Sequence, residues 1–480
     1  MKAKYHLAFV FLGLSLTVLA QKIPITTSSK KALEFYNQGW ELEDKLKLDE
    51  AESFYIRAIN VDSTFALAYL RLGMVKDNYE NRRKHLKLAL KNIDNVSQGE
   101  KYWILGRASF YMPEYNESEE YDYFKKLSES YPEDEIANYL FGYVNLHHGV
   151  FKPELAIAHF EKAISLNPNY VSPHNELTYA YIESKNYSDA KRVAKKQLDL
   201  LPNAVNPLDT YAEIFMRIGA YQKSVQMYMK VLELDATYPW ALMGIAANLN
   251  FQGKHEKARE FLNQIEEDRL SDYEYRHKWR ALVCSYLDQG DFNGATGILE
   301  RQKQAVISGI NKREPTFHLY YAFLRRTRLF FENNEAQKGI AEYYAWKDYT
   351  NEFVESERTK ELVNSYEDYY KAYSAFCKGD LDIAQNHLDI FNKAYKGNND
   401  PSKILQAKIH MKRKEYEKAI NTLKTSNTND PYNQYCLMRA YSAIRDKRKS
   451  MELKKSILGL NELNNINLAL VRQKAMNHKP

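Results

Sequence analysis

The most constraining feature of this 480-residue sequence is an amphipathic phrase that recurs along the chain. It reads AIAHFEKAISLNPNY at 156–170, and versions of it stand at 51–65, 190–204 and 224–238. In each version apolar residues recur at three- and four-residue spacing, which predicts one amphipathic α-helix. A lone helix of this length cannot bury its apolar face. A chain that repeats the phrase therefore predicts a stack of similar helices rather than one compact core.

The phrase keeps a fixed period. Tyr187 and Tyr221 are 34 residues apart, and so are Pro168 and Pro202. Each period contains two apolar stretches at helical spacing, with a short polar turn such as SKN at 184–186 between them. This arrangement predicts a helical hairpin as the repeating unit.

The predicted hairpins resemble tetratricopeptide repeats. The resemblance is fullest at 136–168, where the aromatic, small and proline positions of that family are filled by Tyr139, Gly142, Ala156, Phe160, Ala163 and Pro168. A small residue at the helix crossing lets the two backbones approach, and Pro ends the second helix because it lacks an amide hydrogen. The resemblance implies an all-α fold, a right-handed α/α superhelix of about 11 to 12 helical hairpins, several of them degenerate.

The resemblance extends over nearly all of the chain after its first residues. We expect clear repeats over 32–272, degenerate helical repeats over 273–349, and further repeats with a closing cap over 365–480. The irregular stretch 350–364 is the best candidate for a break between two lobes, although no Gly/Ser-rich or Pro-rich linker marks it. The expected hairpins lie near 32–65, 66–98, 99–134, 135–170, 171–204, 205–238, 239–272, 276–310, 317–350, 365–398, 400–433 and after 434.

The first residues have the pattern of a secretory signal. Residues 1–20 combine a basic start, an apolar run and small or aliphatic residues before Gln21. The apolar run is shorter than the ~20 residues that a membrane span needs. We therefore expect a cleaved signal peptide at 1–20, a linker at 21–31, and an exported protein, periplasmic or secreted, with no stable membrane span after cleavage. An uncleaved anchor is the alternative, and the composition is typical of a bacterial source.

The charge balance argues against nucleic acid as a partner. The formal net charge is only +6, with both signs mixed along the chain. The stretch REPTFHLYYAFLRRTRLFF at 313–331 combines basic and aromatic residues, as some nucleic-acid surfaces do. A helix with one core face and one solvated face explains the stretch equally well. We expect no nucleic-acid binding.

The sequence contains no recognisable motif for catalysis or metal binding. It lacks a phosphate-binding glycine loop, a His-Glu-x-x-His pair, a Cys-x-x-Cys pair and a Gly-x-Ser-x-Gly elbow. His147 and His148 are neighbours, which on a helix point about 100 degrees apart and do not suit one shared metal ion. The three cysteines have no regular spacing, so we expect buried free thiols. The sequence predicts no enzyme, no cofactor and no metal site.

The resemblance also implies where a ligand would bind. In this family the first helix of each hairpin lines the concave side, and its ligand-facing positions fall on polar and aromatic residues here. The predicted groove consists of Tyr139, Tyr143, Asn175, Tyr179, Asp209, Glu213, Arg217, Trp240, Met243 and Asn250, with His147, Glu183, Asn206 and Phe251 beside them. Such a mixture suits an extended peptide. The Lys and Asn pair with which some relatives bind acidic chaperone tails is absent from these positions.

These observations lead to one main hypothesis and two rivals. The main hypothesis is a non-catalytic exported scaffold that binds a protein or peptide in its concave groove. The alternative is a glycan-binding or small-ligand-binding protein of the cell envelope built on the same repeats. The lesser alternative is an enzyme with a site in the degenerate residues 273–400. The sequence leaves the partner, the pathway and the oligomeric state open.

Overall fold

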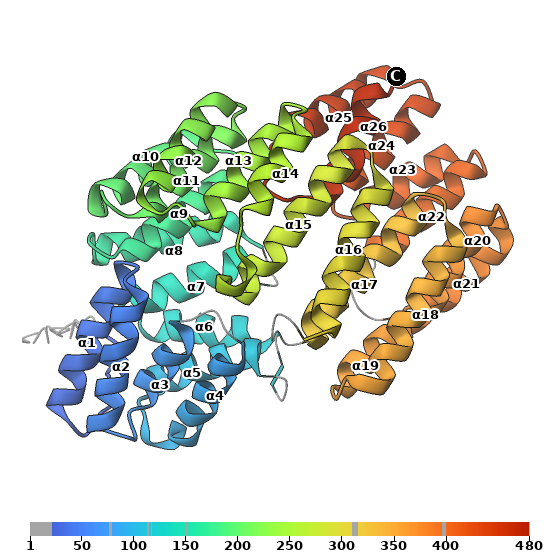
Figure 1. Ribbon diagram of the computed structural model, residues 1–480. Helices are drawn as coiled ribbons and strands as arrows, with labels where there is room; N and C mark the ends of the chain where they lie inside the picture. The colour runs from blue at the N-terminus through green and yellow to red at the C-terminus, as the bar shows by residue number, and fades with distance from the viewer. Residues whose placement is uncertain are drawn as a thin grey trace, which may run out of the picture. The chain divides into compact units, whose positions relative to one another are not determined.

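The computed structural model describes residues 22–75, 79–112, 115–116, 118–148, 151–309, 315–395 and 400–479. Across these ranges the regular structure is helical, and none of them contains a strand. The all-α fold of stacked hairpins is therefore confirmed (Figure 1). The described residues divide into two compact units: unit 1 contains those within 22–75 and 80–184, and unit 2 contains Tyr79 and those within 185–479. The expected signal peptide at 1–20 lies outside the described residues.

Unit 1 contains four complete hairpins and the first helix of a fifth. Among the described helices of this unit, α1 packs on α2, α5 on α6 and α7 on α8, and successive hairpins are joined where α2 packs on α3, α6 on α7 and α8 on α9. The helices are α1 (Lys30–Asp44), α2 (Leu48–Val61), α3 (Ala66–Met74), α4 (Tyr79–Lys91), α5 (Gln98–Tyr111), α6 (Glu119–Ser130), α7 (Glu135–His147), α8 (Pro153–Leu166) and α9 (Val171–Glu183), with a 3₁₀ turn η1 (Ile93–Asn95).

Unit 2 continues the same architecture to the C-terminus. Its hairpins are α11/α12, α13/α14, α15/α16, α17/α18, α20/α21, α22/α23 and α24/α25. The helices are α10 (Tyr187–Leu200), α11 (Val205–Arg217), α12 (Tyr221–Leu234), α13 (Pro239–Phe251), α14 (His255–Asn263), η2 (Glu267–Arg269), α15 (Asp272–Gln289), α16 (Phe292–Ile307), α17 (Pro315–Glu332), α18 (Ala336–Phe353), α19 (Glu357–Ser365), α20 (Glu367–Lys378), α21 (Leu381–Ala394), α22 (Asp400–Lys412), α23 (Tyr416–Lys424), α24 (Pro431–Ala443), α25 (Lys447–Gly459) and α26 (Ile466–Asn477).

The hairpin α7/α8 shows why the repeated residues fold in this way. Asp134 begins α7, because its carboxylate accepts hydrogen bonds from the amides of Ile136 and Ala137 at 2.9 and 2.8 Å. At the helix crossing, a Cβ on Gly142 would lie 2.6 Å from the ring of Phe160. Only glycine permits this approach. The small residue and the aromatic ring of the sequence pattern therefore meet at the crossing.

The stretch 350–364 lies inside unit 2 and does not separate two lobes. It contains most of the short helix α19, and the hydroxyl of Tyr343 donates to the carbonyl oxygen of Val363 at 3.0 Å. Because α18 packs on both α19 and α20, the repeats on either side of this stretch stay joined. The division between the units falls instead after residue 184, so the expected repeat 171–204 contributes α9 to unit 1 and α10 to unit 2.

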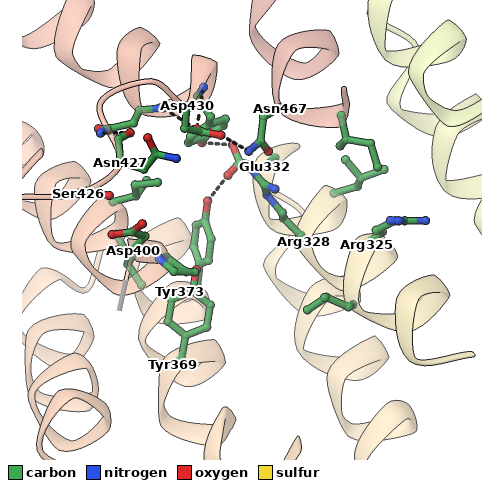
Figure 2. A pocket seen from close by; sticks show the side chains of 18 of the residues that line it. Arg325, Arg328, Glu332, Tyr369, Tyr373, Asp400, Ser426, Asn427, Asp430 and Asn467 are labelled. Atoms are coloured by element: carbon green, nitrogen blue, oxygen red, sulfur yellow. Dashed lines mark hydrogen bonds between the residues drawn. The ribbon is translucent and has the colours of Figure 1, made fainter. Parts of the chain in front are cut away.

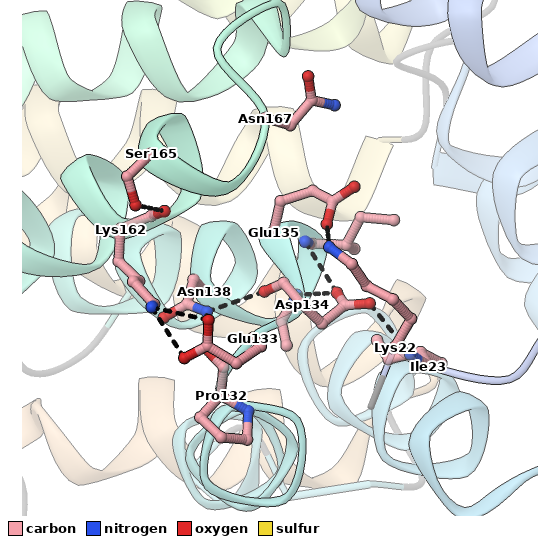
Figure 3. A network of polar contacts seen from close by, with 12 residues as sticks. Lys22, Ile23, Pro132, Glu133, Asp134, Glu135, Asn138, Lys162, Ser165 and Asn167 are labelled. Atoms are coloured by element: carbon pink, nitrogen blue, oxygen red, sulfur yellow. Dashed lines mark hydrogen bonds and ion pairs between the residues drawn. The ribbon is translucent and has the colours of Figure 1, made fainter. Parts of the chain in front are cut away.

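Residues 22–29, most of the expected linker 21–31, run without helix along unit 1 and are bound to it (Figure 3). The amide of Ile23 donates to Asp134 at 3.0 Å, and Lys22 forms an ion pair with Glu135. The carboxylates that accept hydrogen bonds from this segment are Asp62, Glu100 and Asp134. Each stands at or near the end of a different helix, so the segment is part of the fold of unit 1.

The first and last hairpins of unit 1 are joined by Asp44, at the end of α1. Its carboxylate accepts hydrogen bonds from the amides of Val171 and Ser172 at 2.8 and 3.0 Å. Val171, 127 positions further along the chain, is the first residue of α9. A negative charge at a helix N-terminus satisfies amides that have no partner within the helix. The inner side of unit 1 is therefore closed by the chain itself.

The C-terminal segment closes part of unit 2 in a similar way. The last helix, α26, packs on α15, α24 and α25. The loop before α26 reaches α11 and α12, where the hydroxyl of Tyr221 donates to Asn461 Oδ1 at 2.7 Å. The side-chain amide of Asn461 donates in turn to the carbonyl oxygen of Arg217 at 3.3 Å. These contacts join residues that are 240 or more positions apart.

Candidate functional site

The predicted groove residues of unit 1 form a packed aromatic inner face. The ring of Tyr139 lies 5.3 Å from that of Tyr170 and 6.2 Å from that of Phe160. Tyr143 lies 4.6 Å from His147, between ring centroids, and the Arg107 guanidinium stands 5.2 Å above it. Both tyrosines are half-buried, and burial raises the pKa of each hydroxyl. These rings mainly contact one another.

Asn175 and Tyr179 lie on α9, on the same helix as Glu176. The amide of Asn175 donates to Glu176 Oε1 at 3.3 Å, and Glu176 Oε2 lies 2.6 Å from Nε2 of His147. Asn175 and Tyr179 are half-buried, whereas Glu183 is exposed at the end of the helix. In unit 1, Tyr139 and Tyr143 therefore lie on α7, and Asn175 and Tyr179 lie on α9, which contacts α7.

In unit 2 the predicted acidic positions are buried. Asp209 and Glu213 are 9% and 7% exposed, and Glu213 forms an ion pair with Arg217 at 2.9 Å. Burial and the neighbouring Glu213 raise the pKa of the Asp209 carboxyl well above its usual value. Trp240 packs on Tyr273, with ring centroids 5.5 Å apart. The carboxylate of Glu213 therefore already has a cationic partner within the protein.

The C-terminal segment covers other predicted groove residues, and this corrects the sequence interpretation. Met243 is fully buried, and the side-chain amide of Asn464 contacts its sulfur at 3.8 Å. Asn250 is buried and accepts a hydrogen bond from Ser285 at 3.0 Å. The Arg472 guanidinium stands over the ring of Phe251. Repeat periodicity cannot reveal that a distant segment of the chain occupies this face.

A cavity with a volume of about 590 Å³ lies elsewhere in unit 2 (Figure 2). Helices α15, α17, α20, α22 and α24 contribute its walls, and the beginning of α26 contributes one end. Three groups of side chains line it: tyrosines, arginines, and a polar rim of Asp, Asn and Ser. No residue of the predicted groove is among them.

The tyrosine wall of the cavity comes mainly from one face of α20. Tyr366 stands just before the helix, and Tyr369, Tyr370 and Tyr373 follow at spacings that place them on one side of it. Tyr373 is held from behind by Phe331, whose ring is stacked on it at 4.9 Å with an angle of 8°. Packing on both sides fixes these rings before any ligand arrives.

A buried carboxylate fixes the floor of the cavity. Glu332, at the end of α17, accepts hydrogen bonds from the hydroxyls of Tyr373 and Tyr432 and forms an ion pair with Lys408 at 2.9 Å. Burial alone would raise its pKa. The charges of Lys408 and Arg328 and the two hydroxyl groups outweigh that effect and lower the pKa of Glu332 to about 2. This carboxylate is therefore ionised and fully engaged by the protein.

The arginine wall comes from α15 and α17. Arg280, Arg325 and Arg328 line the cavity together. The Arg328 guanidinium stands over Tyr432 at 5.1 Å and is stabilised by Glu332 nearby. Nε of Arg280 and Nη1 of Arg325 are buried without a hydrogen-bond partner. Within the described residues no ion pair involves Arg280 or Arg325, so this wall carries uncompensated positive charge.

The arginine wall changes the ionisation of its neighbours. Burial and the adjacent Arg280 lower the pKa of Arg325 to about 10. Burial and the charges of Arg280, Arg276 and Arg325 lower the pKa of His277 to about 3, so His277 is neutral at pH 7. A histidine that cannot take up a proton leaves the positive charge of the wall to its arginines.

The polar rim lies opposite the arginines. Asp430 begins α24 by accepting from the amides of Tyr432 and Asn433 at 2.9 and 3.0 Å, and it also accepts from Asn467. Asp400, at the start of α22, forms an ion pair with Lys403 at 3.6 Å. The carboxylates of the rim thus have partners of their own.

A family model for the tetratricopeptide repeat matches residues 137–170. Residues 137–170 form a tetratricopeptide repeat. They correspond to α7 and α8, the hairpin with the fullest sequence pattern. The described residues form an all-α fold of stacked helical hairpins, and the match covers one of these hairpins. Among curated proteins, none matches this chain.

The chain is also similar to several solved structures, each at low sequence identity. One is a chain of the APC/C hetero-tetramer Cut9–Hcn1, at 14% identity over 93% of this chain and 76% of that chain, with a TM-score of 0.40. Another is YrrB, described as a tetratricopeptide repeat protein with an unusual peptide-binding site. It has 17% sequence identity, the match covers 37% of this chain and 89% of that chain, and the TM-score is 0.25. A third is a tetratricopeptide repeat protein from Parabacteroides merdae. It has 12% sequence identity, the match covers 69% of this chain and 98% of that chain, and the TM-score is 0.32.

The sequence indicated some of the residues that line this cavity but did not predict that they lie together. In the basic and aromatic stretch 313–331, Arg325 and Arg328 face the cavity, whereas Arg326 forms ion pairs with Glu342 and Glu300. The spacing of four tyrosines along one face of α20 was the signal that could have pointed to a binding wall. Its opposite wall lies on helices up to a hundred residues away, which a repeat pattern does not pair.

The described residues offer little for metal or thiol chemistry. No group of three or more His, Cys, Asp or Glu side chains among them could hold a metal ion. Cys284, Cys377 and Cys436 are free thiols, two of them buried and Cys377 half-buried. Burial raises the pKa of Cys284 to about 12 and those of Cys377 and Cys436 to about 11. Over the same ranges of the chain, no helix is long and apolar enough to cross a membrane.

Proposed function

We propose that this chain is a non-catalytic binding protein that takes a protein or peptide segment into the tyrosine-lined cavity of unit 2. The observation that carries the proposal is the cavity itself: about 590 Å³, walled by tyrosines such as Tyr373, which is stacked on Phe331, and by Arg280 and Arg325, which form no ion pair within the described residues. Tyr and Arg are the residue types that contribute most to binding at protein interfaces. Rings fixed in advance lose little conformational entropy when a ligand binds.

The non-catalytic part of the proposal is supported by the state of the reactive groups. A thiol with a raised pKa is protonated at neutral pH and is a poor nucleophile. Glu332, the acidic group at the centre of the cavity, has a pKa of about 2 and three partners, so it is a weak base that is not free to move a proton.

The groove predicted from the repeat positions stays in the proposal as a second face for the same kind of partner. Tyr143 and Asn175 in unit 1 are half-buried and near the surface of α7 and α9. In unit 2, by contrast, the Arg217 guanidinium forms ion pairs with Glu213 and with Glu462. The two faces predict different mutational sensitivity, so they can be separated by experiment.

The test begins with peptides selected on the intact protein from a displayed random library. Ile404 lines the cavity and is half-buried, so Ile404→Trp would fill part of the space. We expect this change to raise the Kd of selected peptides by about 10-fold or more, measured by fluorescence polarisation. Ile383→Trp places the same ring at a site 54% exposed on α21, outside the cavity, and should leave the Kd unchanged.

The rival face is tested in parallel. A combined change of Tyr143, Asn175 and Arg217 to Ala leaves the cavity intact. Some peptides could bind Ile404→Trp as tightly as the wild-type protein but lose affinity for the triple variant. That result would assign their binding site to the predicted groove and not to the cavity. A library that yields no binder on the wild-type protein would contradict the proposal for both faces.

Glycan or small-ligand binding is the second candidate, and one observation favours it. Six tyrosines line a single cavity, and flat aromatic faces with hydroxyl groups suit the rings of sugars as well as peptides. Binding of an oligosaccharide on a glycan array, lost in Ile404→Trp, would favour this candidate over the peptide.

Export belongs to the proposal as well. Its support is the basic, apolar and small-residue pattern of 1–20 together with the first described residues, which are bound to unit 1 by Lys22 and Ile23. Cleavage after Ala20 would leave that attachment complete. Mass spectrometry of the protein purified from its native cells should find an N-terminus at Gln21; an intact Met1 would refute cleavage at this site.

A further inference from the structure

Two half-buried arginines of unit 2 differ from Arg217 and Arg326, which are half-buried in the same unit. Arg326 pairs with Glu342 and with Glu300, and Arg217 pairs with Glu213. Arg280 and Arg325 have no such partner among the described residues, although each has a buried nitrogen without a hydrogen bond. Both line the same cavity, one from α15 and the other from α17.

The immediate surroundings of these two arginines supply no negative charge. The groups that influence Arg325 most are Arg280, the thiol of Cys284, the hydroxyl of Tyr321 and Arg276. Burial raises the pKa of the Cys284 thiol to about 12, so it stays neutral. Tyr321 places its ring 5.1 Å from the Arg325 guanidinium and contributes only the weak attraction of a ring face. Two like charges thus stand together without compensation.

An arrangement of this kind lowers stability unless an anion joins it. Removing a guanidinium from water without an ionic partner costs free energy, and a second guanidinium nearby adds repulsion. Groups that are strained in the free protein are typical of binding sites, where the ligand supplies the missing interaction. The cavity provides access to both arginines, which line it together.

We propose that Arg280 and Arg325 form an anion subsite in this cavity, which receives an acidic group of the ligand. The shared chemistry is an oxyanion with at least two acceptor oxygens, either the carboxylate of an acidic side chain or a phosphate on a phosphorylated one. A guanidinium presents a fork of N–H donors that matches both. The identification of the ligand as a peptide rests on the proposed function, whereas the anion subsite itself does not.

The first experiment uses inorganic phosphate as the probe, titrated into the full chain by calorimetry at constant ionic strength. We expect saturable binding that weakens by about 10-fold or more in Arg280→Gln and in Arg325→Gln, because a charge-assisted hydrogen bond is lost in each. Arg448→Gln removes the same charge from an exposed site on α25 and should leave binding unchanged within about twofold. Equal phosphate binding by Arg325→Gln and wild type would overturn the subsite.

The second experiment distinguishes the two sources of the anion. A selected peptide is synthesised with Glu, phosphoserine or Gln at its acidic position and measured against wild type and Arg325→Gln, with circular dichroism to verify that the variant is folded. In wild type, the Glu or the phosphoserine peptide should bind more tightly than the Gln peptide. If Arg325→Gln binds that acidic peptide only as weakly as the Gln peptide, the result supports the subsite, and the peptide affected identifies the source of the anion. Peptides that bind both proteins equally, whatever their charge, would retain the proposed function and refute the subsite. Phosphate binding that depends on Arg325, without any peptide binding, would support the anion subsite and refute the proposed function.

Discussion

Unit 1 and unit 2 are both built from helical hairpins, but the cavity of unit 2 contains two arginines whose charges are not balanced in the way that those of Arg71 and Arg107 are in unit 1. In unit 1, Arg71 pairs with Glu43 at 2.5 Å and Arg107 with Glu120 at 3.4 Å. In unit 2, Arg280 and Arg325 line an open cavity and have no ionic partner within the described chain. The comparison teaches that one repeat can serve two purposes: where charges are balanced the inner face acts as core, and where they are not it is available to a ligand.

The largest effect should come from breaking the balance in unit 1. Glu43→Gln would leave the buried Arg71 guanidinium between Trp40 and Trp103 without its carboxylate. We expect a loss of about 3–5 kcal/mol in the free energy of unfolding, measured with urea. Glu41→Gln, an exposed change on the same helix, should alter stability by less than about 0.5 kcal/mol. A similarly small loss in Glu43→Gln would mean that unit 1 does not depend on balanced charges.

The paired carboxylate of Glu332 in unit 2 should make the free energy of unfolding depend on pH. The pKa of Glu332 is about 2 in the folded protein and higher in the unfolded chain, so its stabilisation is present above pH ~4.5 and is lost as pH falls toward 2. We expect this loss to be about 3 kcal/mol in urea unfolding measured across that range. Glu332→Gln should remove this part of the slope, and Glu352→Gln, at an exposed site on α18, should keep it. An unchanged slope in Glu332→Gln would exclude Glu332 as the cause.

Opening the closure of unit 1 should have an intermediate effect. Asp44→Ala removes the acceptor for the amides of Val171 and Ser172 and for the Ser172 hydroxyl. We expect a loss of about 2 kcal/mol in thermal or urea unfolding, with faster hydrogen exchange at the start of α9. Asp44→Asn keeps an acceptor oxygen and should lose less. Equal losses in the two variants would show that the negative charge, and not the hydrogen bonding, closes the unit.

Removing a charge from the arginine wall of unit 2 should raise the free energy of unfolding, whereas the changes above lower it. Arg325→Met replaces an unpaired buried charge with an apolar side chain of similar length, and we expect the free energy of unfolding to rise by about 1–2 kcal/mol without ligand. Arg71→Met in unit 1, which separates a buried pair, should lower it. A loss of stability in Arg325→Met would erase the contrast between the units.

The smallest effect should come from the C-terminal cover of unit 2. Asn461→Ala removes the hydrogen bonds to Tyr221 and to the carbonyl oxygen of Arg217, and we expect a loss of about 1 kcal/mol in urea unfolding. Tyr221→Phe deletes one of the same bonds, so the double variant should lose less than the sum of the two single losses. Strict additivity would show that the two side chains do not act together.

Much of the fold could be predicted from local sequence signals. The pairing of Gly142 with Phe160, the capping residue Asp134 and the helix end after Leu166 all follow from residues within one repeat. The site could not be predicted in this way. Met243 and Asn250 occupy ligand-facing positions of the repeat, yet residues near the C-terminus cover or surround them. A pattern with a period of one hairpin contains no information about such a distant neighbour.

The sequence alone determined the hairpins, their order along the chain and the residues that stack them, because these depend on helical periodicity and on small residues at close crossings. Only the tertiary structure decided which inner faces are closed and which one remains a cavity. That outcome depends on Asp44 meeting Val171, on Asn461 meeting Tyr221, and on Arg325 meeting no carboxylate. Contacts over such separations, and the charge balance that follows from them, exist only once the chain has folded.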